Sequence, residues 1–533
     1  MTKTKTLKNV FEKVKNKLKT INLQNCKKFI QNILKCIYKF FTDRRLYITI
    51  VFVVLTLVIF YEHNYVAKYS VYSSDDFTHY MQMTNVEGFN PDDNFHNGIA
   101  YSKWHCEVWG GVYFGMFLQG FLGINNKVRD LVSLRFWMQV NVALYFISTF
   151  IFIFSLISNV IMRDKPFLEK LSVASALNFV VILLINGFNF YDEPWSWFSA
   201  AVSYSVGISF LLISFAILMS IRFKKKILNI IFNIIKILIA IPIAICSMGT
   251  SLAVVMMGFV FVAAFLIYAI SERKLNIGHI VLSYAYIRSG IYNIMCPGNI
   301  ARRGTAKQGI DIEETLNTLK IFLTKRIETI NGKYIFVVCI ILFSLLAAYF
   351  IYKNVQISRS YMLVSAFLLI MPFAVTGPIA VGYDPTWEFN RTDFMMDMSL
   401  IINLINIVIL LCGVIIYLFE NLIKENEKIV PIVVFALFII VGLRGIKNLE
   451  KVDFNQFDGI TVFNDIFNEK YKKFDEEYKL AFSELFENSG KDVAVVHYPN
   501  EDEKPKFLLY YGVLDAYMYK WFFDVKDIRK AKN

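Results

Sequence analysis

Long apolar runs separated by short basic loops dominate this chain of 533 residues. Most runs are close to about 20 residues, the length that an α-helix needs to cross the hydrocarbon core of a bilayer. The pattern predicts an all-α polytopic membrane protein. Eleven runs are predicted spans: 46–61, 138–161, 171–187, 198–221, 229–247, 251–270, 277–294, 333–352, 361–380, 396–419 and 429–446.

Composition agrees with this prediction, because 56% of the residues are hydrophobic and only 19% are charged. The net charge of +13 is concentrated at the start, where residues 1–45 hold 13 Lys/Arg against 2 Asp/Glu. This basic stretch leads directly into a span, which disfavours nucleic acid as a partner. Apolar residues recur in it at helical spacing, so we expect a helix lying on anionic membrane lipids at the cytoplasmic surface.

Basic residues also set the expected orientation. Every second loop, starting with residues 162–165, carries Lys or Arg and is assigned to the cytoplasm, which leaves the C-terminus outside. We therefore expect a protein of the bacterial cytoplasmic membrane with three parts. These are a basic cytoplasmic segment (1–45), a transmembrane domain (46–446) and a small extracytoplasmic α/β domain (447–533).

The first outer loop, residues 62–137, is long and holds the first candidate site. Its stretch 109–122 is apolar but too short to span, which indicates an interfacial or re-entrant helix. Asp75 and Asp76 follow the first span, and neighbouring carboxylates in a partly dry cavity suit a general base or a metal ligand. The alternative is a solvated pair that caps a helix beginning at Phe77.

Further polar clusters fall on the same predicted outer face. A turn at Pro297-Gly298-Asn299 precedes Arg302 and Arg303, and an arginine fork beside a glycine turn suits phosphate. The alternative is a turn with a solvated basic end. Other candidate substrate-binding residues are Trp109, Asp192, Glu193, Glu388 and Arg391.

Two of these candidates have structural alternatives. Asp192 and Glu193 precede Pro194 and equally suit a helix start. Glu388 and Arg391 could pair with each other instead of contacting a ligand. The nearby Trp195, Trp197 and Trp387 fit an aromatic belt at the membrane interface, with sugar stacking as the less favoured interpretation.

The seven cysteines show no CxxC or metal-type spacing, so free thiols are expected. Cys106 and Cys296 both fall in outer segments, where a disulfide between them is the alternative. The six histidines form no zinc-hydrolase motif, and no nucleotide-binding motif occurs. No cofactor is assigned, and a divalent metal at the carboxylates is neither indicated nor excluded.

Several of these elements together resemble a family of poorly characterised bacterial membrane proteins related to the GT-C glycosyltransferases. They are Asp75-Asp76-Phe77, Trp109-Gly110, the segment 195–204, Cys296-Pro297-Gly298-Asn299 with Arg302, and Arg391. The resemblance covers roughly residues 46–420. It departs from the family at Val112, where an arginine is expected, and at residues 249–251, where an acidic residue is expected.

The resemblance implies a GT-C-like bundle that transfers a sugar from a polyprenyl-phosphate carrier to a cell-envelope acceptor outside the membrane. Asp75 and Asp76 would then be the catalytic motif, and Arg302 would contact phosphate. Three alternatives stay open. They are a flippase or transporter of lipid-linked polysaccharide, a polysaccharide polymerase or ligase, and a non-catalytic scaffold. The predicted spans are nearly free of ionisable residues, with Lys236 and Arg288 as exceptions whose side chains could reach a membrane surface, and this disfavours transport.

Overall fold

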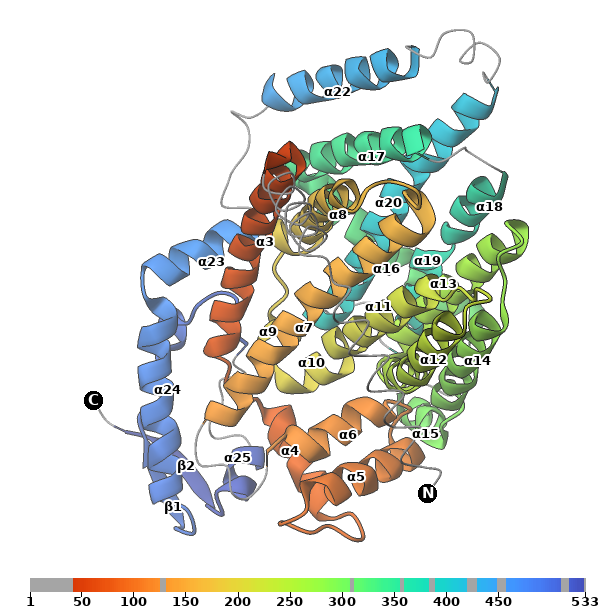
Figure 1. Ribbon diagram of the computed structural model, residues 1–533. Helices are drawn as coiled ribbons and strands as arrows, with labels where there is room; N and C mark the ends of the chain where they lie inside the picture. Colours follow the sequence, from red (N-terminus) through yellow and green to blue (C-terminus); the bar gives the residue numbers. More distant parts are fainter. Residues whose placement is uncertain are drawn as a thin grey trace, which may run out of the picture.

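The computed structural model describes residues 42–124, 131–306, 311–354, 359–382, 389–418, 429–447, 457–509 and 517–531. Across these ranges the chain is helical except for two short strands near the C-terminus (Figure 1). The surface helix predicted within residues 1–45 lies almost wholly outside the described residues.

Eight helical stretches of the described chain are long and apolar enough to cross a membrane, so the chain is a polytopic membrane protein. They follow the predicted runs closely, because length and hydrophobicity are the properties from which both are recognised. The eight are α3 (Arg44–Lys68), α7 with a π-helical end (Val132–Ile161), α8 with a π-helical end (Phe167–Gly187), α10 with α11 (Phe198–Ser203 and Ser205–Ser220), α12 (Ile227–Met248), α13 (Leu252–Ser271), α18 with α19 (Arg359–Leu368 and Met371–Gly382) and α20 (Asn390–Leu418).

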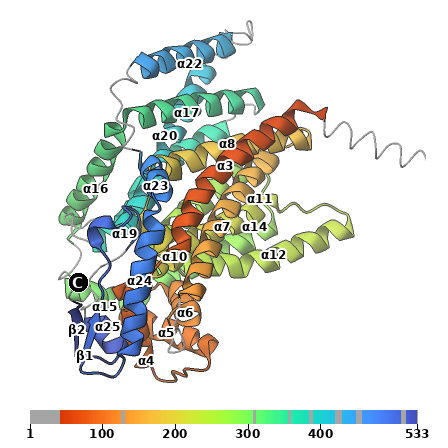
Figure 2. The same ribbon diagram turned by 90° about the vertical axis from the view of Figure 1, so that its left-hand side faces the viewer.

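A ninth candidate span is a broken one. Helix α16 (Ile312–Gly332) meets α17 (Tyr334–Asn354) at an angle of 94°. The other two predicted spans are helical as α14 (Ile277–Ile294) and α22 (Ile429–Lys447), although neither is among the eight. Figures 1 and 2 show α17 and α22 lying across one end of the bundle. The described residues thus support eight or nine spans, and the predicted count of eleven is not confirmed, because apolar length does not report a helix's direction.

Short helices gather at the opposite end of the bundle (Figures 1 and 2). They are α4 (Ser74–Thr84), α5 (Asn94–Val108), α6 (Tyr113–Leu122) and α15 (Pro297–Ala306). The apolar stretch at 109–122 is a helix only from Tyr113, and it packs along α5. A Cβ atom on Gly120 would lie 2.8 Å from the Cα of Gly98, so these two helices touch where glycine leaves room.

Cys106 and Cys296 form a disulfide that joins α5 to the start of α15, with 5.4 Å between their Cα atoms. The expectation of free thiols is therefore wrong for this pair. The cause is a close backbone approach, since a Cβ on Gly298 would lie 2.4 Å from the nitrogen of Gly110. Disulfides persist in oxidising compartments, so the bond agrees with the extracytoplasmic placement expected for both residues.

The disulfide gives the first testable prediction. We expect Cys106 and Cys296 to resist alkylation by maleimide in the unfolded, unreduced protein and to react after reduction. The double substitution to serine should lower stability by about 2–5 kcal/mol, the usual range for a lost native disulfide. Cys339→Ser is the matched control, because that thiol is free. Alkylation without reduction would contradict the assignment.

The C-terminal segment packs along the side of the bundle and reaches its α4 end (Figure 2). It contains α23 (Asp458–Phe467), α24 (Lys470–Glu487), β1 (Val493–Val496), α25 (Tyr517–Phe522) and β2 (Asp527–Lys530). The two strands pair in parallel with Val493 opposite Asp527, which confirms a small helical segment with a sheet. The domain boundary at residue 447 stays a prediction.

Aromatic side chains hold this segment against α4. The ring of Phe77 lies 4.6 Å from that of Tyr519 and 4.9 Å from that of Phe522. Phe77 and Tyr519 are fully buried, so their contact excludes water from the residues beside them. The C-terminal segment therefore covers α4 at Phe77, the residue directly after Asp76.

Candidate functional site

Asp76 is buried at the start of α4, with 1% of its surface exposed. One carboxylate oxygen accepts a hydrogen bond from the backbone N–H of Ser73 at 2.9 Å. The other accepts the hydroxyl hydrogen of Ser199 in α10 at 2.5 Å. Burial raises the pKa of Asp76 to about 6, although both hydrogen bonds lower it. Both oxygens are thus engaged within the protein.

The helix-capping alternative accordingly applies to Asp76, in a form that the sequence did not predict. The helix begins at Ser74 rather than at Phe77, and its cap is buried rather than solvated. A carboxylate that bonds back to the N-cap N–H satisfies a donor that the helix leaves open. Asp76 therefore fixes α4 against α10, which positions its neighbour.

Asp75 is the open member of the pair. Its side chain is exposed, while the protein packed around it raises the pKa of its carboxyl. The positive charge of Arg391 opposes this and lowers the pKa. Asp75 is thus exposed to solvent and lies within electrostatic reach of a guanidinium that comes from a helix more than 300 residues further along the chain.

Arg391 lies in the first turn of α20, and one carboxylate and two aromatic rings contact its guanidinium. Its guanidinium pairs with the carboxylate of Glu193 at 2.8 Å, and its backbone N–H donates to the same carboxylate at 3.0 Å. The guanidinium carbon lies 4.9 Å from the ring centre of Trp197 and 4.4 Å from that of Phe389. Such fixed geometry keeps the charge in place beside Asp75.

The neighbouring Asp192 joins the same contact between α9 (Asp192–Ser196) and α20. Its carboxylate accepts a hydrogen bond from the side-chain amide of Asn390 at 2.6 Å. Burial raises the pKa of Asp192, and this hydrogen bond lowers it. Since Asp192 and Glu193 both bond to the start of α20, they act first as anchors of that helix end.

The structure corrects the interpretation of two nearby tryptophans. Trp195 is fully buried against Tyr145 and Phe394, and Trp197 is buried beneath Arg391. Neither belongs to an aromatic belt at the membrane interface. The predicted pairing of Glu388 and the place of Trp387 lie outside the described residues, and the partner found for Arg391 is Glu193.

Asn299 and Trp109 form a separate group around the disulfide. The side chain of Asn299 accepts the N–H of Gly111 at 3.0 Å and donates to the carbonyl of Asn293 at 2.6 Å. Trp109 ends α5 and leaves 45% of its surface exposed. Asn299 therefore fastens the α5–α6 turn to α14, and its role in substrate binding stays a prediction.

The arginines that follow Asn299 are in a helix rather than in a turn. Pro297 begins α15, as expected for a residue without an N–H at the first helical position, and the helix runs through Arg302 and Arg303 to Ala306. The side chains of the two arginines lie outside the described residues. Their role in binding phosphate stays a prediction.

Histidines that sequence analysis left aside connect the two groups. His79 lies four residues after Asp75, on the same face of α4, and its Nδ1 is 2.7 Å from the hydroxyl of Tyr101 in α5. Burial lowers the pKa of His79 to about 4, so its ring is neutral near pH 7. His105 in turn contacts the carbonyl of Gly110 at 3.0 Å. The four-residue spacing of Asp75 and His79 was the sequence signal that could have placed both on one face of a helix.

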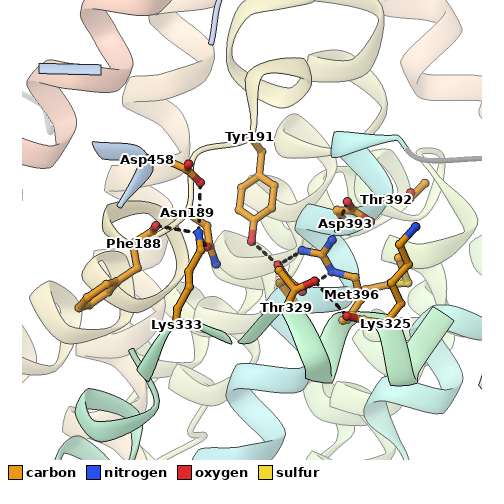
Figure 3. A network of polar contacts seen from close by, with 12 residues as sticks. Phe188, Asn189, Tyr191, Lys325, Thr329, Lys333, Thr392, Asp393, Met396 and Asp458 are labelled. Atoms are coloured by element: carbon orange, nitrogen blue, oxygen red, sulfur yellow. Dashed lines mark hydrogen bonds and ion pairs between the residues drawn. The ribbon is translucent and has the colours of Figure 1, made fainter. Parts of the chain in front are cut away.

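A buried charge network between α16 and α20 was also missed (Figure 3). The guanidinium of Arg326 donates a hydrogen bond to Asp393 at 2.7 Å and hydrogen bonds to both carboxylate oxygens of Asp397. The hydroxyl of Tyr191 donates to Asp397 at 2.7 Å. Asp397 falls within the predicted span 396–419, so this span holds a buried ionisable residue that its apolar sequence did not lead us to expect.

The same network fixes the bend between α16 and α17. The ammonium of Lys333, at the bend, donates to the side chain of Asn189 at 2.6 Å and approaches Asp458 of α23 at 3.4 Å (Figure 3). Tyr191 and Asn189 belong to the loop that leads into α9. This loop therefore contacts the bend through Asn189 and α20 through Tyr191.

Comparisons of the chain with protein-family models, with curated proteins and with solved structures found no match. The fold defines a polytopic membrane protein. Within the described residues, no group of three or more His, Cys, Asp or Glu side chains is arranged to hold a metal ion.

The pKa of Asp76 gives a second prediction, on stability. The folded protein holds a proton on Asp76 up to pH of about 6, whereas the group's ordinary pKa is 3.8. Between these values the folded state binds more protons than the unfolded state, so stability falls as pH rises through this window. Asp76→Asn removes the titration, and its amide oxygen can still accept the N–H of Ser73 while its NH2 donates to the hydroxyl oxygen of Ser199.

The unfolding free energy of wild type, relative to that of Asp76→Asn, should therefore fall by roughly 3 kcal/mol as the pH rises from 3.5 to 7. Thermal unfolding of both proteins in the same detergent measures it. Parallel curves over the whole range would show that Asp76 does not titrate as its burial requires.

Proposed function

We propose that the chain is an integral membrane glycosyltransferase of GT-C-like architecture. It would transfer a sugar from a polyprenyl-phosphate carrier to a cell-envelope acceptor on the extracytoplasmic face of the bacterial cytoplasmic membrane. The observation that supports the proposal is the exposed Asp75 within electrostatic reach of Arg391, whose guanidinium is fixed by Glu193, at the end of the bundle that the disulfide and the basic N-terminus both favour as the outer one.

In this reaction the acceptor hydroxyl oxygen bonds to the anomeric carbon of the sugar, and the bond from that carbon to the phosphate oxygen breaks. The polyprenyl phosphate leaves with the electron pair, and Asp75 takes the hydroxyl proton. A carboxyl with a raised pKa suits this role better than a fully solvated one. Asp76 would position Asp75 rather than touch substrate, because its oxygens bond to Ser73 and Ser199.

Arg391 supplies a fixed hydrogen-bond donor for this step. Glu193 compensates much of its charge, but the ion pair and the two aromatic rings hold the guanidinium rigidly. A preorganised donor stabilises charge that develops on a leaving phosphate without reorganising at the moment of reaction. Arg302 and Arg303 remain further candidates for this contact.

A transporter of lipid-linked saccharide is the second candidate function. The ion network of Arg326, Asp393 and Asp397 favours it, because ionisable groups within spans mark transport pathways in many membrane proteins. The two functions differ in their product. A transferase forms a new glycosidic bond, whereas a transporter changes only the side of the membrane on which the lipid-linked sugar is found.

The test is a comparison of cell-envelope glycans and lipid-linked sugars with and without the protein. A transferase predicts that one sugar substituent disappears from the envelope glycan, while its lipid-linked donor accumulates on the outer side of the membrane. Accumulation of the donor on the inner side would favour transport instead.

A further inference from the structure

A cavity of about 350 Å³ lies between α5, α6 and α14. Its wall is aromatic and aliphatic, and Lys103 of α5 stands at its rim. The apolar side chains that line it are Ile99, Tyr113, Phe114, Phe117 and Tyr292. The cavity is therefore apolar inside, with a cation at its edge.

The surface around this cavity is apolar and exposed. Ile99 leaves 49% and Tyr292 leaves 52% of its surface uncovered, and Phe95, Ile287 and Ile291 beside them are also exposed. Contiguous apolar surface of this kind is unusual toward water and ordinary toward lipid chains. Helix α14 packs against α12, a candidate membrane span, so this apolar side suits contact with lipid chains.

A second cation lies on the same side. Arg288 is exposed on α14 one helical turn before Tyr292, among exposed apolar side chains. An arginine in such a place is costly unless its long side chain reaches a phosphate or water at the membrane surface. Neither Arg288 nor Lys103 forms an ion pair with the residues that the structure describes. Lys103 thus lines the apolar cavity, and Arg288 lies one helical turn from Tyr292, which also lines it.

Helix α5 separates this cavity from the candidate site. Ser102 and Cys106 line the cavity, whereas Tyr101 and His105 lie on the face of α5 that contacts His79 of α4. A lipid bound in the cavity therefore does not reach Asp75. The occupant that fits is a resident lipid, not the reacting carrier.

We propose that the cavity binds one anionic phospholipid of the outer leaflet. Lys103 and Arg288 bind its phosphate, and the first part of an acyl chain lies against Phe114 and Phe117. Anionic rather than zwitterionic lipid is favoured because Lys103 at the cavity and Arg288 one turn from it form no ion pair with any acidic residue that the structure describes. The lipid would wedge the hairpin of α5 and α6 against α14, beside the disulfide that joins the same elements.

The test uses the full chain, purified in detergent and titrated with phosphatidylglycerol or phosphatidylcholine, with bound lipids counted by native mass spectrometry. We expect one phosphatidylglycerol to be retained in preference to phosphatidylcholine. Lys103→Gln and Arg288→Gln should each weaken its binding by about fivefold, the effect of one cation near an anionic lipid. Lys320→Gln, an exposed lysine of α16, is the matched control.

Three outcomes would overturn the proposal. They are equal retention of the two phospholipids, binding by both cavity variants equal to that of Lys320→Gln, and retention of polyprenyl phosphate with no retention of phosphatidylglycerol. Both substitutions are at exposed positions, so unchanged thermal unfolding should show that the variants fold. The assay does not involve sugar transfer, and its result is independent of the proposed reaction.

Discussion

Asp75→Asn is expected to reduce sugar transfer by about 10²- to 10⁴-fold, the contribution of a positioned general base. The amide keeps the shape of the carboxyl but cannot take the acceptor proton. Because Asp75 is exposed and its side chain makes no hydrogen bond to the residues that the structure describes, the abundance and membrane insertion of the protein should not change. Analysis of envelope glycans in cells that carry only the variant measures the effect.

Two controls separate this effect from a general one. Glu87→Gln removes another exposed carboxylate shortly after α4 and should leave transfer unchanged. Asp76→Asn should alter the pH dependence of stability and reduce transfer less than Asp75→Asn, because Asp76 acts through the position of α4. Wild-type glycan in the Asp75→Asn strain would remove the catalytic assignment.

Arg326→Met is expected to cause the largest loss of stability, about 3–5 kcal/mol. It leaves Asp393 and Asp397 charged and without their main partner, and the side chain of Asp397 is only 1% exposed. Removing one member of a buried ion pair costs more than the pair contributes, since the remaining charge stays desolvated. Thermal unfolding in a fixed detergent measures the loss.

Lys320→Met is the matched control for this prediction, because it removes an exposed cation from the same helix. Adding Asp393→Asn and Asp397→Asn to Arg326→Met should restore part of the stability, since no uncompensated charge then remains. An Arg326→Met protein that unfolds at the same temperature as Lys320→Met would show that the network does not hold α16 to α20.

The helices were the most predictable part of the fold. All eleven predicted runs are helical, because an apolar run of about 20 residues has few alternatives in a bilayer. Their paths were less predictable. The right-angle bend at Lys333 depends on contacts with Asn189 and Asp458, which are far away in the sequence. Hydropathy averaged over a short stretch of sequence does not report contacts between residues so far apart in the chain.

The candidate site was predicted in part. Asp75, Asp192, Glu193 and Arg391 do lie at connected positions, as the clustering of polar residues on one side suggested. The different environments of Asp75 and Asp76 were not predictable, because Asp76 is bound by Ser199, which is more than 120 residues away in the sequence. Asn299 was assigned to substrate for its place beside arginines, yet its amide holds two backbone segments together.

The most direct measurement is the release of polyprenyl phosphate by the purified protein in liposomes, supplied with extracted lipid-linked sugars and envelope glycan. The wild-type protein should release the carrier and form glycosylated acceptor in equal amounts, and Asp75→Asn should do neither at a comparable rate. Equal release by the two proteins, or movement of the intact donor across the bilayer without release, would contradict a transferase that uses Asp75.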